Sequence, residues 1–167
     1  TVQPDEIFSN NINFFIKSYL INICTYLEAY LQDIAFEHSS RITERLKKAK
    51  TPHNFLYSKL SRDVKDKDLE YEIASYKYDK KELSNNISGN PYKTIKAFEL
   101  IGINLISNIT FLEYKDLVGS IVNKRNSIIH HKDDANDISF EDLIINIDFF
   151  LCYMCSIKKV LSSEINR

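Results

Sequence analysis

Glycine and proline are scarce in this sequence of 167 residues, which contains three of each. Their scarcity leaves long stretches, such as residues 5–50, in which nothing interrupts a helix. No apolar run approaches the ~20 residues that a bilayer-spanning helix requires, so we expect no membrane partner. The formal net charge is -1, which provides no global field that attracts nucleic acid. Binding of RNA would therefore require a local patch.

The three cysteines, Cys24, Cys152 and Cys155, are an odd number and lie at apolar positions. This pattern favours reduced thiols in the core of a cytosolic protein. The CxxC spacing of the last two falls inside an apolar helix pattern, which favours packing over zinc or redox chemistry. No signal-peptide pattern opens the sequence, so we expect a cytoplasmic location. The sequence begins at Thr1 without a Met, which indicates an excised domain or a shortened chain.

Apolar residues recur at spacings of three and four, and no convincing alternation indicates a sheet. The length predicts one domain over residues 1–167, which buries roughly 70% of its unfolded surface. We expect an all-α fold, namely an antiparallel bundle of four main helices with short extra helices in the middle segment.

The first half of the chain predicts one long helix over about residues 5–36 and a second helical piece over about 40–50. The apolar stripe of the long helix is expected to be Phe8, Ile12, Phe15, Tyr19, Ile23, Leu27, Tyr30 and Ile34. Residues 38–89 form an irregular middle segment, in which the clearest loop is 83–89.

The motif-bearing helices are expected within residues 90–161. Asn90 and Pro91 are typical of an N-cap and a first helical turn. The next helix begins at Phe111 or Tyr114 and ends at about His131. A polar turn over 132–137 follows, and Ser139 with Asp142 resembles a capping box for the last helix. The core stripe of that helix is expected to include Phe140, Leu143, Ile147, Phe150, Met154, Ile157 and Leu161.

The segment 125–131 (RNSIIHH) places an arginine at the centre of an apolar helix face. A charge aimed at a core is costly unless it is paired or has a task. Asn126 and His130 lie one turn apart, but Arg125 and His130 point roughly 140° apart on a helix. They converge if the arginine wraps round, if the helix frays, or if a second copy contributes. The competing interpretation is an arginine that neutralises a buried carboxylate and a partly exposed histidine near a helix end.

Two further residues are candidate supports for this segment. Glu28 lies at the edge of the first helix's apolar stripe, where it would either pair with and orient Arg125 or form a surface salt bridge. His131 points about 100° away from His130, which favours a solvated histidine over one that contacts RNA or a partner.

The segment 125–131, preceded by LVGSIVNK and followed by a polar turn and a capped helix, resembles the motif of HEPN domains. That superfamily is all-helical and is marked by Arg, four to six residues, and then His, often with a polar residue after Arg. Residues 90–161 resemble the C-terminal helical pair of its RiboL-PSP-like branch, and residues 19–36 resemble the first long helix.

The resemblance implies a metal-independent endoribonuclease without a cofactor, often a toxin or antiviral effector with an antitoxin partner. Arg125 and His130 match the motif pair, and Asn126 matches its polar companion. Some HEPN toxins carry a modified Tyr two positions after the motif His. Lys132 stands there, so that regulation is not implied. Some HEPN domains are non-catalytic, so a helical dimerisation or partner- or nucleotide-binding module is the rival function.

The chemistry agrees with this resemblance. RNA supplies its own nucleophile, the 2′-hydroxyl, and a histidine side chain is suited to move protons near neutral pH. Arginine offers a permanently charged fork for phosphate oxygens. One motif histidine per chain provides one acid-base group, which predicts a homodimer whose motifs meet across a two-fold axis.

Three further patterns have less specific interpretations. A metal site is disfavoured because the available side chains match no known ligand spacing; they are His130, His131, Asp133, Asp134 and Asp137. The basic segment 41–50 favours a solvated helix face over an RNA track. Tyr71, Tyr76 and Tyr78 lie among charges, where packing is favoured over base stacking.

Overall fold

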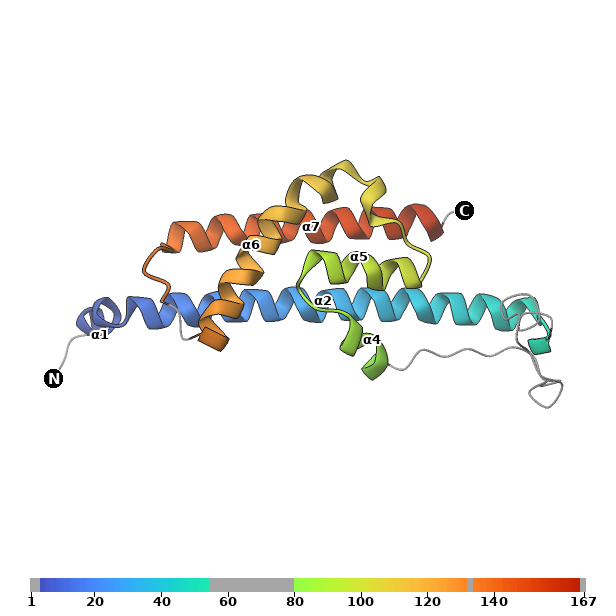
Figure 1. The fold of residues 1–167 in the computed structure, drawn as a ribbon, viewed down its shortest axis with the longest axis horizontal. Coiled ribbons are helices and arrows are strands. Elements are labelled where there is room, and N and C mark those ends of the chain that lie inside the picture. The colour runs from blue at the N-terminus through green and yellow to red at the C-terminus, as the bar shows by residue number, and fades with distance from the viewer. Residues whose placement is uncertain (1–3, 55–79, 132–133, 166–167) are drawn as a thin grey trace.

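The structure is a computed structural model that describes residues 4–54, 80–131 and 134–165 (Figure 1). Its helices are α1 (Pro4–Asn10), α2 (Ile12–Ala49), α4 (Lys80–Asn86), α5 (Pro91–Leu100), the 3₁₀ helix η2 (Leu105–Ser107), α6 (Ile109–His131) and α7 (Phe140–Ile165). No strand occurs in these three ranges. The predicted all-α bundle of four main helices is confirmed, and these helices are α2, α5, α6 and α7. The bundle is only partly antiparallel, because α6 alone runs opposite to the other three (Figure 1).

Helix α2 has 38 residues, and α4, α6 and α7 all pack against it. Figure 1 shows α5 and α7 running alongside α2 in the same direction, while α6 crosses obliquely in the opposite direction. Helix α6 packs on both α2 and α7, so its inner face meets two partners. None of the helices in the described ranges has the length and apolar character of a membrane span.

Helix α2 differs from the prediction at both ends. At the N-terminal end, Asn11 separates α1 from α2, where one continuous helix was expected. At the other end, α2 continues through residues 36–40, where a break between two helices was expected. The Ser39 hydroxyl donates to the Phe36 carbonyl at 2.9 Å, so this serine is satisfied inside the helix. The helix ends at Ala49, and the following Lys50 caps it with a left-handed φ of 49°, shortly before Pro52.

The middle segment is less irregular than predicted. Residues 38–49 belong to α2, and α4 includes the first part of the predicted 83–89 loop. The short helices expected within 55–79, and Tyr71, Tyr76 and Tyr78 with them, lie outside the described residues.

Two of the three helix starts predicted in the second half are confirmed, whereas α6 begins at Ile109, before the predicted Phe111 or Tyr114. The Asn90 side chain accepts hydrogen bonds from the backbone N–H groups of Tyr92 at 3.0 Å and Lys93 at 3.2 Å. The Ser139 hydroxyl accepts from the Asp142 N–H at 3.0 Å, and the Asp142 carboxylate accepts from the Ser139 N–H at 2.8 Å. These side chains satisfy N–H groups that a helix start otherwise leaves unpaired. They therefore fix where α5 and α7 begin.

The buried faces of α2 and α7 required correction. The core face of α2 is rotated from the predicted one and consists of Ile16, Leu20, Cys24, Leu27, Leu31 and Ala35. Phe8, Ile12 and Tyr19 are exposed, as is Ile147 of α7. Ile147 is the one exposed residue of the predicted α7 face, whose other members are buried or packed against the core. Helix α2 has apolar residues on more than one side, so spacing alone did not identify the side that packs.

Candidate functional site

Arg125 lies on the face of α6 that packs against α2. Its Nη2 donates to Oε1 of Glu28 in an ion pair, and 15% of the arginine side chain and 27% of the glutamate side chain are exposed. The predicted pairing of Glu28 with Arg125 is confirmed, and the pair is more enclosed than a surface salt bridge. Packing of α6 on α2 therefore fixes the direction of the guanidinium.

Gly89 provides a second contact to the same carboxylate. Its backbone N–H donates to Glu28 Oε1 at 3.1 Å. A Cβ at position 89 would lie 3.2 Å from Cγ2 of Val122 and 3.3 Å from Glu28 Oε1, so an alanine would crowd the carboxylate. Sequence analysis missed Gly89. Its signal was the position of a rare glycine directly before the Asn90–Pro91 helix start.

Cys24 lies one turn before Glu28 and is fully buried, so its predicted place in the core is confirmed. Burial raises the pKa of the Cys24 thiol to about 11, although the positive charge of Arg125 acts in the opposite direction. The thiol therefore stays protonated at neutral pH and adds no second negative charge beside Glu28.

The other two cysteines do not follow the core prediction. Cys152 is half-buried and Cys155 is exposed. The apolar residues of α7 extend onto a side that no other described helix covers, where Ile144 and Leu151 are also exposed. An apolar pattern that runs round a helix does not establish burial.

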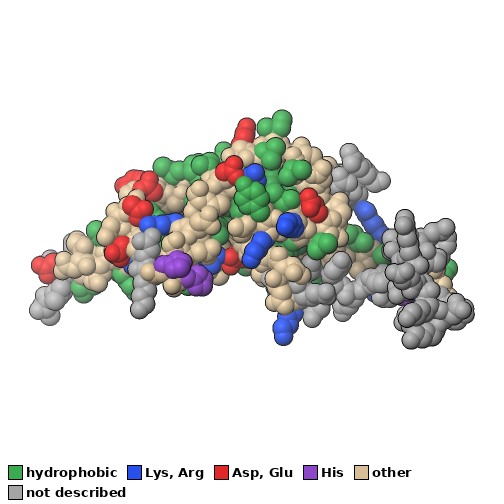
Figure 2. All heavy atoms as spheres, viewed as in Figure 1, with side chains coloured by type: hydrophobic (Ala, Val, Ile, Leu, Met, Phe, Trp, Pro, Cys, Tyr) green, Lys and Arg blue, Asp and Glu red, His purple; other side chains and the backbone are tan. Residues whose placement is uncertain are grey.

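The histidines lie at the C-terminal end of α6, which stays helical through His131. His130 and His131 are exposed and Asn126 is half-buried. Figure 2 shows histidine side chains on the surface at this end of α6. Among the described residues, none of these three side chains forms a hydrogen bond or ion pair with another residue. The structure thus brings Arg125 to Glu28 and does not bring Arg125 to His130.

The turn after α6 is attached to the start of α2. Asp134 accepts hydrogen bonds from Lys17 Nζ at 2.9 Å and Asn13 Nδ2 at 3.1 Å. The Ala135 N–H donates to Asn13 Oδ1 at 3.0 Å, and Lys124 pairs with Asp137 at 2.9 Å. The bonds from Lys17 and Asn13 hold the pKa of the Asp134 carboxyl below its usual value. This attachment fixes the end of the helix that presents the histidines.

The residues weighed for a metal site are separated by these contacts. Asp134 and Asp137 face lysines, and Asp133 lies outside the described residues. Within the described ranges, no three His, Cys, Asp or Glu side chains are grouped closely enough to hold a metal ion.

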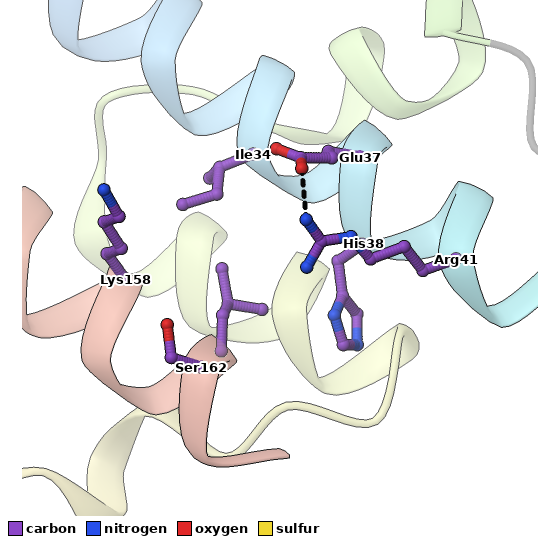
Figure 3. Close-up of a pocket in the computed structure, with 7 residues that line it drawn as sticks. Ile34, Glu37, His38, Arg41, Lys158 and Ser162 are labelled. Carbon is purple, nitrogen blue, oxygen red and sulfur yellow. Dashed lines mark hydrogen bonds and ion pairs between the residues drawn. The ribbon is translucent and has the colours of Figure 1, made fainter. Parts of the chain in front are cut away.

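A cavity of about 260 Å³ lies between α2 and α7 (Figure 3). Its charged lining residues are Glu37, Arg41 and Lys158, and Glu37 pairs with Arg41 at 2.5 Å. Glu37 lies about 14 Å along α2 from Glu28, and no predicted site residue lines this cavity. The nearby basic segment 41–50 is mostly exposed, in agreement with a solvated helix face.

Comparison with known proteins gives one result. The RiboL-PSP-HEPN family pattern matches residues 2–163, which is nearly the whole chain. No curated protein and no solved structure matches the chain.

Proposed function

Because the chain belongs to the RiboL-PSP-HEPN family, we propose that it is a metal-independent endoribonuclease that cleaves single-stranded RNA. The observation that supports this most is the fixed position of Arg125, five residues before an exposed histidine on the same helix. The motif residues therefore occupy the kinds of environment that the chemistry requires: a positioned cation and an accessible proton carrier.

Each step of the cleavage has a residue assigned to it. The RNA 2′-hydroxyl loses its proton and attacks the adjacent phosphorus, and the 5′-oxygen leaves with a proton. His130 moves these protons, and Arg125 stabilises the negative charge of the phosphorane. Asn126, half-buried between them along α6, orients the phosphate or His130. Glu28 and Gly89 hold the guanidinium in place before RNA binds.

A homodimer supplies what one chain lacks. Cleavage needs one group to accept a proton and another to donate one, but each chain has one motif histidine. His130 and the neighbouring Ile129 are exposed, so this end of α6 is accessible to a second chain. We therefore propose a two-fold dimer in which the 125–131 segments face each other.

The decisive experiment is cleavage of single-stranded RNA in EDTA. We expect products with 2′,3′-cyclic phosphate and 5′-hydroxyl ends, identified by mass spectrometry, and no cleavage at a 2′-deoxy position. His130→Ala should abolish the activity, while His131→Ala is the matched control with an equally exposed neighbour. A 5′-phosphate product that requires a divalent metal would contradict the mechanism.

We also propose a cellular role as a toxin or antiviral effector, controlled by an antitoxin or by another protein. Expression of the parent chain should arrest growth, and expression of His130→Ala should not. Equal growth with both chains, despite equal protein levels, would contradict this role.

One observation favours a second function. Most of the Arg125 side chain is buried and bonded to Glu28, which is also what a purely structural arginine would do. A non-catalytic dimerisation or partner-binding module would keep this pair and would not cleave RNA. The same EDTA assay separates the two functions, because the module leaves RNA intact at every protein concentration.

A further inference from the structure

Helix α5 presents lysines without carboxylate partners. Lys93 and Lys96 are exposed and form no ion pair within the described residues. By contrast, Lys17, Lys80 and Lys124 bind aspartates at 2.6–2.9 Å. Lys93 and Lys96 lie one turn apart and therefore share a side of the helix. Glu99 follows on α5 but does not neutralise either lysine.

An exposed aromatic ring lies beside these lysines. Tyr92 is 60% exposed, and its ring contacts Lys115 of α6, whose Nζ lies 5.0 Å from the ring centroid. Lys115 pairs with Asp116 at 3.5 Å and covers one part of the ring, and the rest of the ring faces solvent. A hollow of about 270 Å³ adjoins this surface and is lined by Asn85, Lys93, Lys96 and Leu100, among others. The two lysines and an asparagine thus line the hollow, and the open ring of Tyr92 lies next to Lys93 on α5.

The position of this surface relative to Arg125 is set by Gly89. Gly89 binds Glu28, the partner of Arg125, and α5 begins two residues later. Figure 1 shows α5 running along α2 away from the end of α6 that bears the histidines. In Figure 2, blue lysine or arginine side chains over α5 and purple histidines at the end of α6 appear on one face. From Gly89 to Lys96 the path is about 10 Å long.

We propose that Tyr92, Lys93 and Lys96, the lysine–tyrosine surface, bind single-stranded RNA adjacent to the cleavage site. The proposal rests on the ribonuclease function proposed above. The lysines contact successive phosphates, and a base stacks on the open side of the Tyr92 ring. The surface provides the local patch that a chain of net charge -1 requires in order to bind RNA.

The first test measures binding of a fluorescent single-stranded RNA by anisotropy over a range of salt concentrations. His130→Ala serves as the background so that the RNA stays intact. Adding Lys93→Gln and Lys96→Gln should weaken binding about tenfold at 0.1 M salt. It should also make the slope of log affinity against log salt shallower by about 1.4, because each single-strand phosphate contact contributes about 0.7.

The matched control is the pair Lys158→Gln and Lys159→Gln on α7, which removes the same charge from two exposed lysines without ion pairs in the described residues. Its affinity and salt slope should stay near those of the background protein. If the two double variants weaken binding equally, net charge explains the effect and the proposal fails.

Variants of Tyr92 distinguish the contribution of base stacking to RNA binding from the contribution of charge. Tyr92→Ala should weaken RNA binding about tenfold with an unchanged salt slope, and Tyr92→Phe should bind like the background protein. Displacement of the RNA by an acidic peptide whose own binding needs the lysines but not Tyr92 would assign the surface to an acidic protein and overturn the proposal.

Activity provides a separate readout. In the active protein, the α5 lysine variant should raise KM for a long RNA more than KM for a dinucleotide, because a dinucleotide offers fewer phosphates to the lysines. If the ribonuclease function itself fails, no variant cleaves either substrate, while the binding experiment still decides the role of α5.

Discussion

Arg125 and His130 lie five residues apart on α6, yet their surroundings are opposite. Arg125 is mostly buried, is paired with Glu28 and is supported through Gly89. His130 is exposed and has no side-chain partner among the described residues. One half of the candidate site is therefore assembled within a single chain, whereas no contact among the described residues positions the other half. A preorganised cation and an accessible proton carrier have different structural requirements.

The largest expected effect separates these two halves. His130→Ala should reduce cleavage by at least about 10²–10³-fold and leave the melting temperature unchanged. Arg125→Ala should reduce cleavage similarly and also lower stability by about 1–3 kcal/mol, because it leaves the Glu28 carboxylate half-buried and unpaired. Initial rates and thermal melts followed by circular dichroism measure both effects. Equal loss of stability in the two variants would remove the distinction.

A mixing experiment tests whether the exposed half is completed by a second copy. If each active dimer needs two His130 side chains, a 1:1 mixture of parent and His130→Ala chains, allowed to exchange subunits, retains about a quarter of the parental activity. Independent sites would retain about half. Rates measured across several mixing ratios distinguish a squared from a linear dependence on the parent fraction, and the linear result would count against the shared site.

Two glycines provide a smaller and more local test of the buried half. Gly89→Ala should lower stability by about 1 kcal/mol and reduce cleavage, because the new methyl group crowds Glu28 and Val122. Gly119→Ala is the control: its Cβ would lie 3.8 Å from Pro91, and it should stabilise α6 by about 0.5–1 kcal/mol without changing cleavage. Melting temperatures and initial rates are compared for both variants.

The smallest expected effect concerns the turn that supports the histidine half. Bonds from Lys17 to Asp134 and from Lys124 to Asp137 lower the pKa of both carboxyls in the folded protein. This stabilisation is present above the unfolded pKa of about 3.9 and is lost as the pH falls through the lower folded pKa values. In melts between pH 3 and 7, Asp134→Asn with Asp137→Asn should reduce the acid-dependent loss of stability. A curve parallel to that of the parent protein would show that these contacts contribute nothing.

The sequence predicted the parts of the site that side-chain chemistry marks. Arg125 stood out because a charge occupied an apolar face, and Glu28 followed as a carboxylate at the edge of the facing stripe. The starts of α5 and α7 were predictable because Asn90, Ser139 and Asp142 bond to nearby backbone N–H groups, which is local geometry.

The remainder depended on long-range packing. Gly89 acts through its backbone N–H, which every residue except proline has, so its residue type does not reveal its partner. The prediction named the wrong core face for α2 because that helix has apolar residues on several sides. The chain stays helical between the predicted pieces 5–36 and 40–50, where the Ser39 hydroxyl bonds to a carbonyl of the same helix.

The residues that contact each other at the candidate site are far apart in the sequence, which determines when the site can form during synthesis. Glu28 and Arg125 are 97 residues apart, and Asn13 and Asp134 are 121 residues apart. At about 5–20 residues per second, a ribosome adds Arg125 roughly 5–20 s after Glu28. A partly synthesised chain has α2 but neither the arginine nor the histidines, and closing such long loops has an entropic cost. The proposed ribonuclease site therefore cannot form on a nascent chain before α6 has been synthesised and has packed on α2.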